Sequence, residues 1–168
     1  MAGYSGKPVV QKLGLKPGFR IFVDGLSVAY GDLVGDLPAG VKLVKAAKAP
    51  LDVVHLFATE ARGLAAKLRG YRAAIAPDGM IWVSWPKKAS GIASDLTDVV
   101  VRDTALPLGL VDIKVCGRRC LVRAQIRDSE GGALSAGPGP GRGERTLASI
   151  IVRPDCRARA RGNAGRRR

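Results

Sequence analysis

The sequence predicts an α/β domain with a mostly parallel sheet, followed by a disordered C-terminal tail. Short apolar runs rich in β-branched residues alternate with segments of helical period, which is typical of strand–helix–strand units. The runs are continuously apolar, as expected of strands covered on both faces. A length of 168 residues fits one domain with at most a tail. A Rossmann-like three-layer sandwich with right-handed crossovers is the simplest arrangement.

Five strands are predicted from these apolar runs. The first follows the turn signal Lys16-Pro17-Gly18, the second is the weakest, and the third is opened by Pro50. In order they are Phe19–Val23, Val41–Val44, Leu51–Phe57, Met80–Trp85 and Leu110–Val115.

Two helices are predicted between the later strands. Residues 59–75 place apolar side chains on one face at helical spacing, with Thr59 as N-cap, and the turn Pro77-Asp78-Gly79 follows. Asp95 is expected to cap the second helix, with Asp98 at the reciprocal capping-box position, and Pro107 ends it.

The positive charge is unevenly distributed. The chain holds 28 Lys and Arg against 14 Asp and Glu, a net charge of +14, which by itself suggests a polyanionic partner such as nucleic acid. Residues 1–116 carry a net +5, mostly as Lys, whereas residues 117–168 carry +9 with 13 Arg and no Lys. The two regions therefore follow different compositional rules. A net +5 on the domain is no more than solubility requires.

Other compositional features exclude several protein classes. No apolar run approaches 18 residues, and the first residues lack the apolar stretch of a secretory signal. Three cysteines are too few and too odd in number for a disulfide framework. We therefore expect a cytoplasmic protein without a membrane span.

A ligand site is expected where the parallel strands end, since ligands of such sheets bind beyond the carboxyl ends of the strands. Asp24 and Gly25 follow the first strand and Thr59 follows the third. A phosphate-cradling loop needs closely spaced glycines, and only Gly25 is in place. The segment 23–31 is thus interpreted as an ordinary turn, with Asp24 in a degenerate S-adenosylmethionine-type loop as the alternative.

The segment Trp85-Pro86-Lys87-Lys88 ends the fourth strand and is the most distinctive stretch of the domain. Its lysines could bind an anion and its tryptophan could stack on a base. A surface loop with solvated lysines and a tryptophan packed over the sheet edge is the favoured interpretation. Trp85, Lys87 and Lys88 remain weak candidates for ligand binding.

No catalytic or metal-binding residues are predicted, and no cofactor is identified. His55 is the single histidine and lies inside an apolar strand, so a neutral buried histidine is expected. Cys116 and Cys120 lack further ligands at zinc spacing. Helix capping and an ion pair between Asp98 and Arg102 account for the polar cluster near residue 95.

Residues 1–116 closely resemble the bacterial domain of unknown function family 3052. The matching segments are MAGYSGKPVVQKLGLKPG (1–18), IAPDG (75–79), WVSWPKKASG (82–91), DLTDVVVR (95–102) and LPLGLVDIKVC (106–116). The resemblance implies a methyltransferase-type Rossmann sandwich and brings no activity with it. One departure is at residues 22–27, where members usually have a Gly-Ala-Pro-like turn.

The resemblance stops at Cys116, and we hypothesise a frameshift there. Codons can be chosen for residues 117–130 that, preceded by two bases GC and regrouped, encode AVDDVWSGLKFVIR, which resembles the usual final strand of the family. Out-of-frame reading of GC-rich DNA also explains the Arg, Gly, Ala and Pro composition that follows. The gene sequence tests this, because the hypothesis fails if the real codons cannot be regrouped.

The organisation expected is a domain over residues 1–116, its final strand missing or replaced, and a largely disordered tail over 117–168. Within the tail, Thr146–Val152 has strand character, whereas residues 131–145 and 154–168 are expected to be disordered. A sheet edge left unpaired beside this tail would favour aggregation.

Three functions remain open from the sequence. The favoured one is a small domain that is non-enzymatic or a degenerate ligand-binding module. The first alternative is an S-adenosylmethionine-dependent methyltransferase, for which Asp24 or Asp52 are poor matches to a ribose-binding acid. The second is non-specific nucleic-acid binding through the Arg-rich tail, which should fall steeply with salt. Protein partners and oligomeric state stay unknown.

Overall fold

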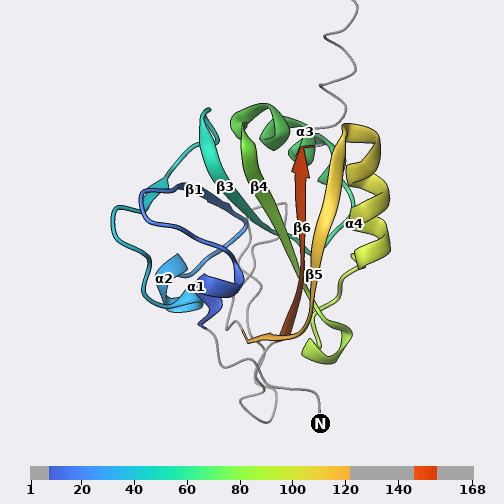
Figure 1. Ribbon diagram of the computed structural model, residues 1–168. Coiled ribbons are helices and arrows are strands. Elements are labelled where there is room, and N and C mark those ends of the chain that lie inside the picture. Colours follow the sequence, from blue (N-terminus) through green and yellow to red (C-terminus); the bar gives the residue numbers. More distant parts are fainter. Residues whose placement is uncertain (1–7, 122–145, 155–168) are drawn as a thin grey trace, which may run out of the picture.

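The computed structural model describes residues 8–121 and 146–154. Six strands form one sheet in the order β2-β1-β3-β4-β6-β5 (Figure 1). The first four run parallel, and β6 pairs antiparallel with both β4 and β5. The strands are β1 (Arg20–Asp24), β2 (Lys42–Val44), β3 (Leu51–Phe57), β4 (Ile75–Pro86), β5 (Leu110–Leu121) and β6 (Thr146–Pro154).

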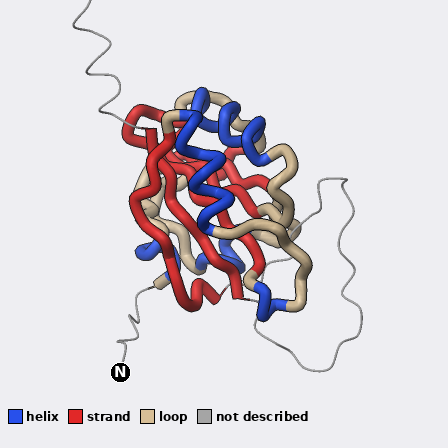
Figure 2. Tube along the Cα trace, turned by 90° about the vertical axis from the view of Figure 1, so that its right-hand side faces the viewer, coloured by secondary structure: helices blue, strands red, loops and turns tan. Residues whose placement is uncertain are grey.

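Helices cover both faces of this sheet, so the molecule has the three layers of a Rossmann-like α/β sandwich, as predicted. The short helices α1 (Val9–Lys12) and α2 (Tyr30–Val34) lie on one side, and α3 (Leu64–Ala74) and α4 (Asp98–Ala105) lie on the other. Seen from the side in Figure 2, helices stand in front of the strands. Two 3-10 turns, η1 (Lys88–Ser90) and η2 (Leu106–Leu108), complete the described elements.

The sheet separates two apolar cores because alternate side chains of β3 and β4 point to opposite faces. Val53, Phe57 and Trp82 pack with α1 and α2, whereas Val54 and Ile81 pack with α3 and α4. All five are 0–1% exposed. Both faces of the central strands are therefore dry, which explains their continuously apolar sequences.

Trp82 connects the N-terminal segment to the sheet. Its side chain is fully buried, and its indole Nε1 donates a hydrogen bond of 3.0 Å to the carbonyl oxygen of Leu13. We expect Trp82→Phe to lower the free energy of unfolding by about 2–4 kcal/mol, since it loses buried volume and leaves a buried carbonyl without its donor.

Trp85→Phe is the matched control for this prediction, because Trp85 is also buried but no indole hydrogen bond is seen among the described residues. Urea unfolding followed by circular dichroism should show a smaller loss for this control. Equal losses in the two variants would contradict a role for the Leu13 hydrogen bond.

Both helix starts differ from the sequence prediction. Gly63 adopts a left-handed conformation and α3 begins only at Leu64, so Thr59 is not an N-cap. The N-cap of α4 is Thr97, whose hydroxyl accepts from the Val100 N–H at 3.2 Å. Asp95 instead accepts a hydrogen bond from the Ala61 N–H at 2.7 Å, and so holds the loop before α3. Capping patterns misplaced both starts because tertiary hydrogen bonds claimed the two side chains.

Strand β6 comes from beyond Cys116. Its bounds include the strand predicted at Thr146–Val152, and Cys116 itself lies within β5. The described sheet thus contains residues from both compositional regions. The segments predicted to be disordered fall almost entirely outside the described residues. No described helix is long and apolar enough to span a membrane.

Candidate functional site

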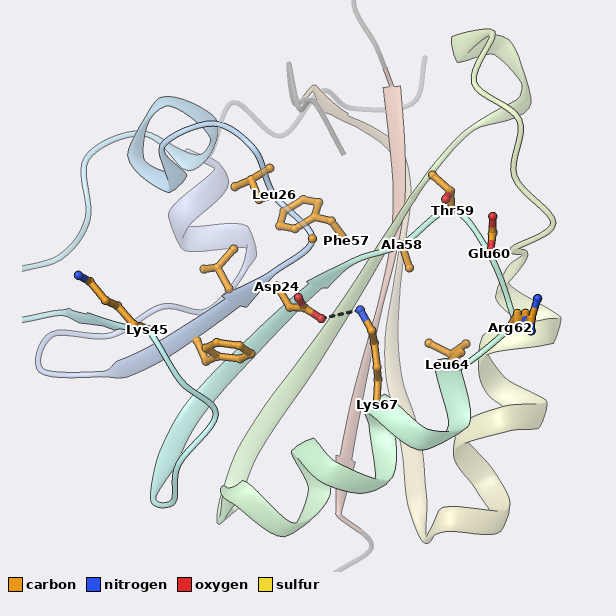
Figure 3. A pocket seen from close by; sticks show the side chains of 13 residues that line it. Asp24, Leu26, Lys45, Phe57, Ala58, Thr59, Glu60, Arg62, Leu64 and Lys67 are labelled. Carbon is orange, nitrogen blue, oxygen red and sulfur yellow. Dashed lines mark hydrogen bonds and ion pairs between the residues drawn. The ribbon is translucent and has the colours of Figure 1, made fainter. Parts of the chain in front are cut away.

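A pocket of about 440 Å³ opens at the carboxyl ends of β1, β2 and β3 (Figure 3). The chain passes from β1 to β2 on one side and returns to β3 on the other side of β1, so this is the point where the strand order reverses. In open α/β sheets the crevice at such a switch point binds the ligand. The volume lies within the range of small-molecule sites.

Gly25 brings the ends of β1 and β3 together at this pocket. It has a left-handed φ of +77°, and a Cβ atom built there would lie 2.0 Å from the Phe57 carbonyl oxygen. Only a glycine can combine this conformation with so close an approach. A single glycine therefore shapes the loop that the sequence analysis judged too poor in glycines.

Asp24 is the central charged group of the pocket. Its Oδ2 accepts a hydrogen bond of 2.8 Å from Lys67 Nζ and one of 2.5 Å from the Tyr71 hydroxyl. Burial opposes ionisation of Asp24, but these hydrogen bonds and the Lys67 charge outweigh it and hold the pKa of Asp24 below its usual value. The carboxylate is thus ionised at neutral pH.

Tyr71 is fixed by the same contact and by packing against β1. Its ring lies 5.9 Å from that of Phe22, and burial together with the Asp24 charge raises the pKa of Tyr71. Lys67 and Tyr71 are four residues apart on α3, so they project from one face of that helix onto Asp24. Figure 3 shows Lys67 reaching from the helix to the strand end.

The rest of the lining mixes apolar surface with charge. The apolar part includes Phe22, Leu26, Phe57 and Leu64, and the charged part adds Lys45, Glu60 and Arg62. Lys45 follows β2 and Arg62 precedes α3, so the two cations stand on opposite sides of the Asp24–Lys67 pair (Figure 3).

The structure brings together only part of the candidate set from the sequence. Asp24, Gly25 and Thr59 line the pocket. Trp85 is 5% exposed within the core shared with α3 and α4, so its face is not available to a base. Lys87 and Lys88 follow β4 and do not line the pocket. The sequence analysis missed Lys67 and Tyr71, although their spacing of four on a predicted helix was visible.

His55 lies in a buried polar network on the other face of β3. The Tyr30 hydroxyl lies 2.8 Å from its Nδ1, the Ser84 hydroxyl lies 2.8 Å from its Nε2, and the ring stacks on Phe57. Burial lowers the pKa of His55 to about 3, so the imidazole is neutral, as predicted. Since all three polar side chains are 1–4% exposed, the network is structural.

No group of three or more His, Cys, Asp or Glu side chains in the described part of the chain is arranged to hold a metal ion. The side chains of Cys116 and Cys120 lie outside the described residues, so the prediction that they bind no zinc stays a prediction.

No protein-family model and no curated protein matches this sequence. Its structure does resemble solved structures. TrmN from Thermus thermophilus matches over 88% of this chain and 47% of its own, with a TM-score of 0.50 and 10% identity.

Two further matches are methyltransferases by their descriptions. A TehB-like SAM-dependent methyltransferase from Corynebacterium glutamicum matches over 87% of this chain and 85% of its own, at 9% identity and a TM-score of 0.48. Magnesium protoporphyrin IX methyltransferase from Synechocystis, with bound SAM, matches over 88% and 74%, at 12% identity and a TM-score of 0.49.

The chain has the Rossmann-like fold found in methyltransferases. This corrects the favoured functional expectation. A non-enzymatic or degenerate domain was expected because the loop after β1 lacks closely spaced glycines. The structural neighbours are S-adenosylmethionine-dependent methyltransferases and favour the alternative instead.

Proposed function

We propose that this protein is a methyltransferase that uses S-adenosylmethionine (SAM). The observation that carries the proposal is the pocket at the switch point between β1 and β3, in a sheet whose antiparallel β6 lies between β4 and β5. Such a crevice is the ligand site of an open α/β sheet.

The residues of the pocket suit a nucleoside that carries a charged amino-acid tail. Phe22, Leu26 and Phe57 offer apolar surface for an adenine ring. The ionised Asp24 and Glu60 suit the cationic and hydroxyl groups of SAM, whereas Lys45 and Arg62 suit its carboxylate. Lys45 stands where a ribose-binding acid would follow β2, so the ribose hydroxyls must be bound by other groups.

The chain's own contribution is to bind and orient. When SAM is bound, an acceptor atom takes its methyl carbon, the electron pair of the broken C–S bond stays on sulfur in S-adenosylhomocysteine, and any displaced proton passes to water. Asp24 is held rigidly by two donors, so its negative charge keeps one position while a cationic ligand binds. Gly25 keeps the strand ends close and so defines the floor of the pocket.

Titration calorimetry of the full chain with S-adenosylhomocysteine tests the proposal. Binding with a dissociation constant below about 1 mM is expected, equivalent to roughly −4 kcal/mol. Absence of heat at that concentration would reject SAM as the cofactor.

Leu26→Glu should weaken this binding at least about tenfold, because it places a carboxylate on the apolar wall of the pocket. Leu43→Glu is the matched control, since Leu43 is 48% exposed on β2 and does not line the pocket. Thermal unfolding of both variants checks that they fold. Equal effects of the two substitutions would place the ligand elsewhere.

A further inference from the structure

Exposed cations gather along the same edge of the sheet as the pocket. Lys45 follows β2, Arg62 lies in the loop after β3, and Lys87 and Lys88 follow β4. None of the four has a hydrogen bond or ion pair among the described residues. An unpaired surface cation gains nothing for the fold, so four of them at the mouth of one pocket require another explanation.

The nearby acids do not neutralise these cations. Asp24 pairs with Lys67 inside the pocket, and Asp95 accepts a hydrogen bond from the Ala61 N–H. The edge therefore presents positive charge that is free to meet a ligand outside the cofactor pocket.

The spread of the cations indicates the size of that ligand. They follow β2, β3 and β4, which span three strand intervals in the order β2-β1-β3-β4. At roughly 4.8 Å per interval this distance is about 14 Å. One phosphate or carboxylate cannot contact both ends of such a row, whereas a chain of phosphates can.

From this arrangement we propose that the methyl acceptor is a single-stranded nucleic acid, whose phosphates contact Lys45, Arg62, Lys87 and Lys88. The proposal rests on the methyltransferase function above. The strand must be single or locally opened, because a base can reach a pocket at a sheet edge only when it leaves its stack. These contacts involve the described domain and not the Arg-rich residues beyond it.

The test uses the full chain and a fluorescein-labelled RNA of about 12 nucleotides, within the size range of single-strand sites. Fluorescence anisotropy measures the affinity of Lys87→Ala/Lys88→Ala as a function of salt. We expect at least a tenfold loss of affinity at low salt and a salt slope reduced by roughly two. Lys87 and Lys88 do not line the pocket, so S-adenosylhomocysteine binding should be unchanged.

Lys16→Ala/Lys42→Ala is the matched control. Both lysines are exposed, they lie near the starts of β1 and β2 at the opposite edge, and the variant has the same net charge. Charge alone, or binding through residues 117–168, would change both variants equally, and that result would overturn the proposal. Adenosine monophosphate competing as well as the RNA would overturn it too, since a small acceptor would then suffice.

The outcomes separate the two proposals. RNA binding that is lost only in the Lys87/Lys88 variant supports the acceptor proposal, and methyl transfer from labelled SAM to the RNA would complete it. If S-adenosylhomocysteine binds but the two variants bind RNA equally, the acceptor proposal fails and the cofactor proposal stands. If the cofactor product does not bind, the proposed function fails whatever the RNA result.

Discussion

Gly25→Ala is expected to lower the free energy of unfolding by at least about 3–4 kcal/mol and to abolish S-adenosylhomocysteine binding. The left-handed φ of +77° costs an alanine roughly 1–2 kcal/mol. The larger part arises because the new methyl group would lie 2.0 Å from the Phe57 carbonyl oxygen. The ends of β1 and β3 must then separate, and the floor of the pocket is lost with their contact.

Gly63→Ala separates the two causes. Gly63 has a φ of +78°, but a Cβ atom there meets nothing within 4 Å. Urea unfolding should show only the conformational cost in this control, about 1 kcal/mol, with ligand binding retained. Similar losses for both variants would mean that the contact between the two strand ends does not matter for stability.

The second large effect is a loss of stability on mild acidification. The pKa of His55 is lowered from 6.5 to about 3 by burial, so below pH 6.5 the unfolded chain binds a proton that the folded chain refuses. The free energy of unfolding should therefore fall with decreasing pH, by up to about 1.4 kcal/mol per pH unit, between pH 6.5 and 3. The total is up to about 4 kcal/mol. Asp24 acts in a lower range, since its pKa is lowered from 3.8.

Urea unfolding at a series of pH values measures this slope. The chain has a single histidine, so no other imidazole contributes. His55→Gln should be less stable near pH 7, where Tyr30 and Ser84 lose their imidazole partner, but its stability should change little between pH 6.5 and 5. Wild-type stability that is flat over that interval would show that His55 takes up a proton in the folded state.

Elements that bury both faces could be predicted from the sequence. The strands at Leu51–Phe57 and Met80–Trp85 were found because every side chain in them is apolar or neutral, and the structure buries nearly all of them. The short helix Tyr30–Val34 was not predicted, since five residues carry too little periodic signal. The placement of β6 between β4 and β5 depends on partners far apart in the chain, which local patterns do not encode.

The site was predicted in part for a similar reason. The carboxyl ends of parallel strands meet at one edge, so Asp24, Gly25 and Thr59 were correctly assigned to it. Lys67 and Tyr71 depend on the rotation of α3 about its axis, and the predicted start at Thr59 was five residues early. Trp85 was given a possible exposed role because the sequence does not show that β6 pairs along β4. The frameshift after Cys116 stays a prediction for the gene sequence to test.

The position of β6 has a consequence for synthesis on the ribosome. When the first 121 residues have emerged, β4 has no neighbour on one side, because its partner there is β6 and not β5. The open backbone of Ile81, Trp82 and Val83 must wait until residue 152 has been made. An apolar edge exposed for that interval can pair with another nascent chain. Efficient folding in the cell should therefore depend on how quickly the ribosome translates residues 122–154.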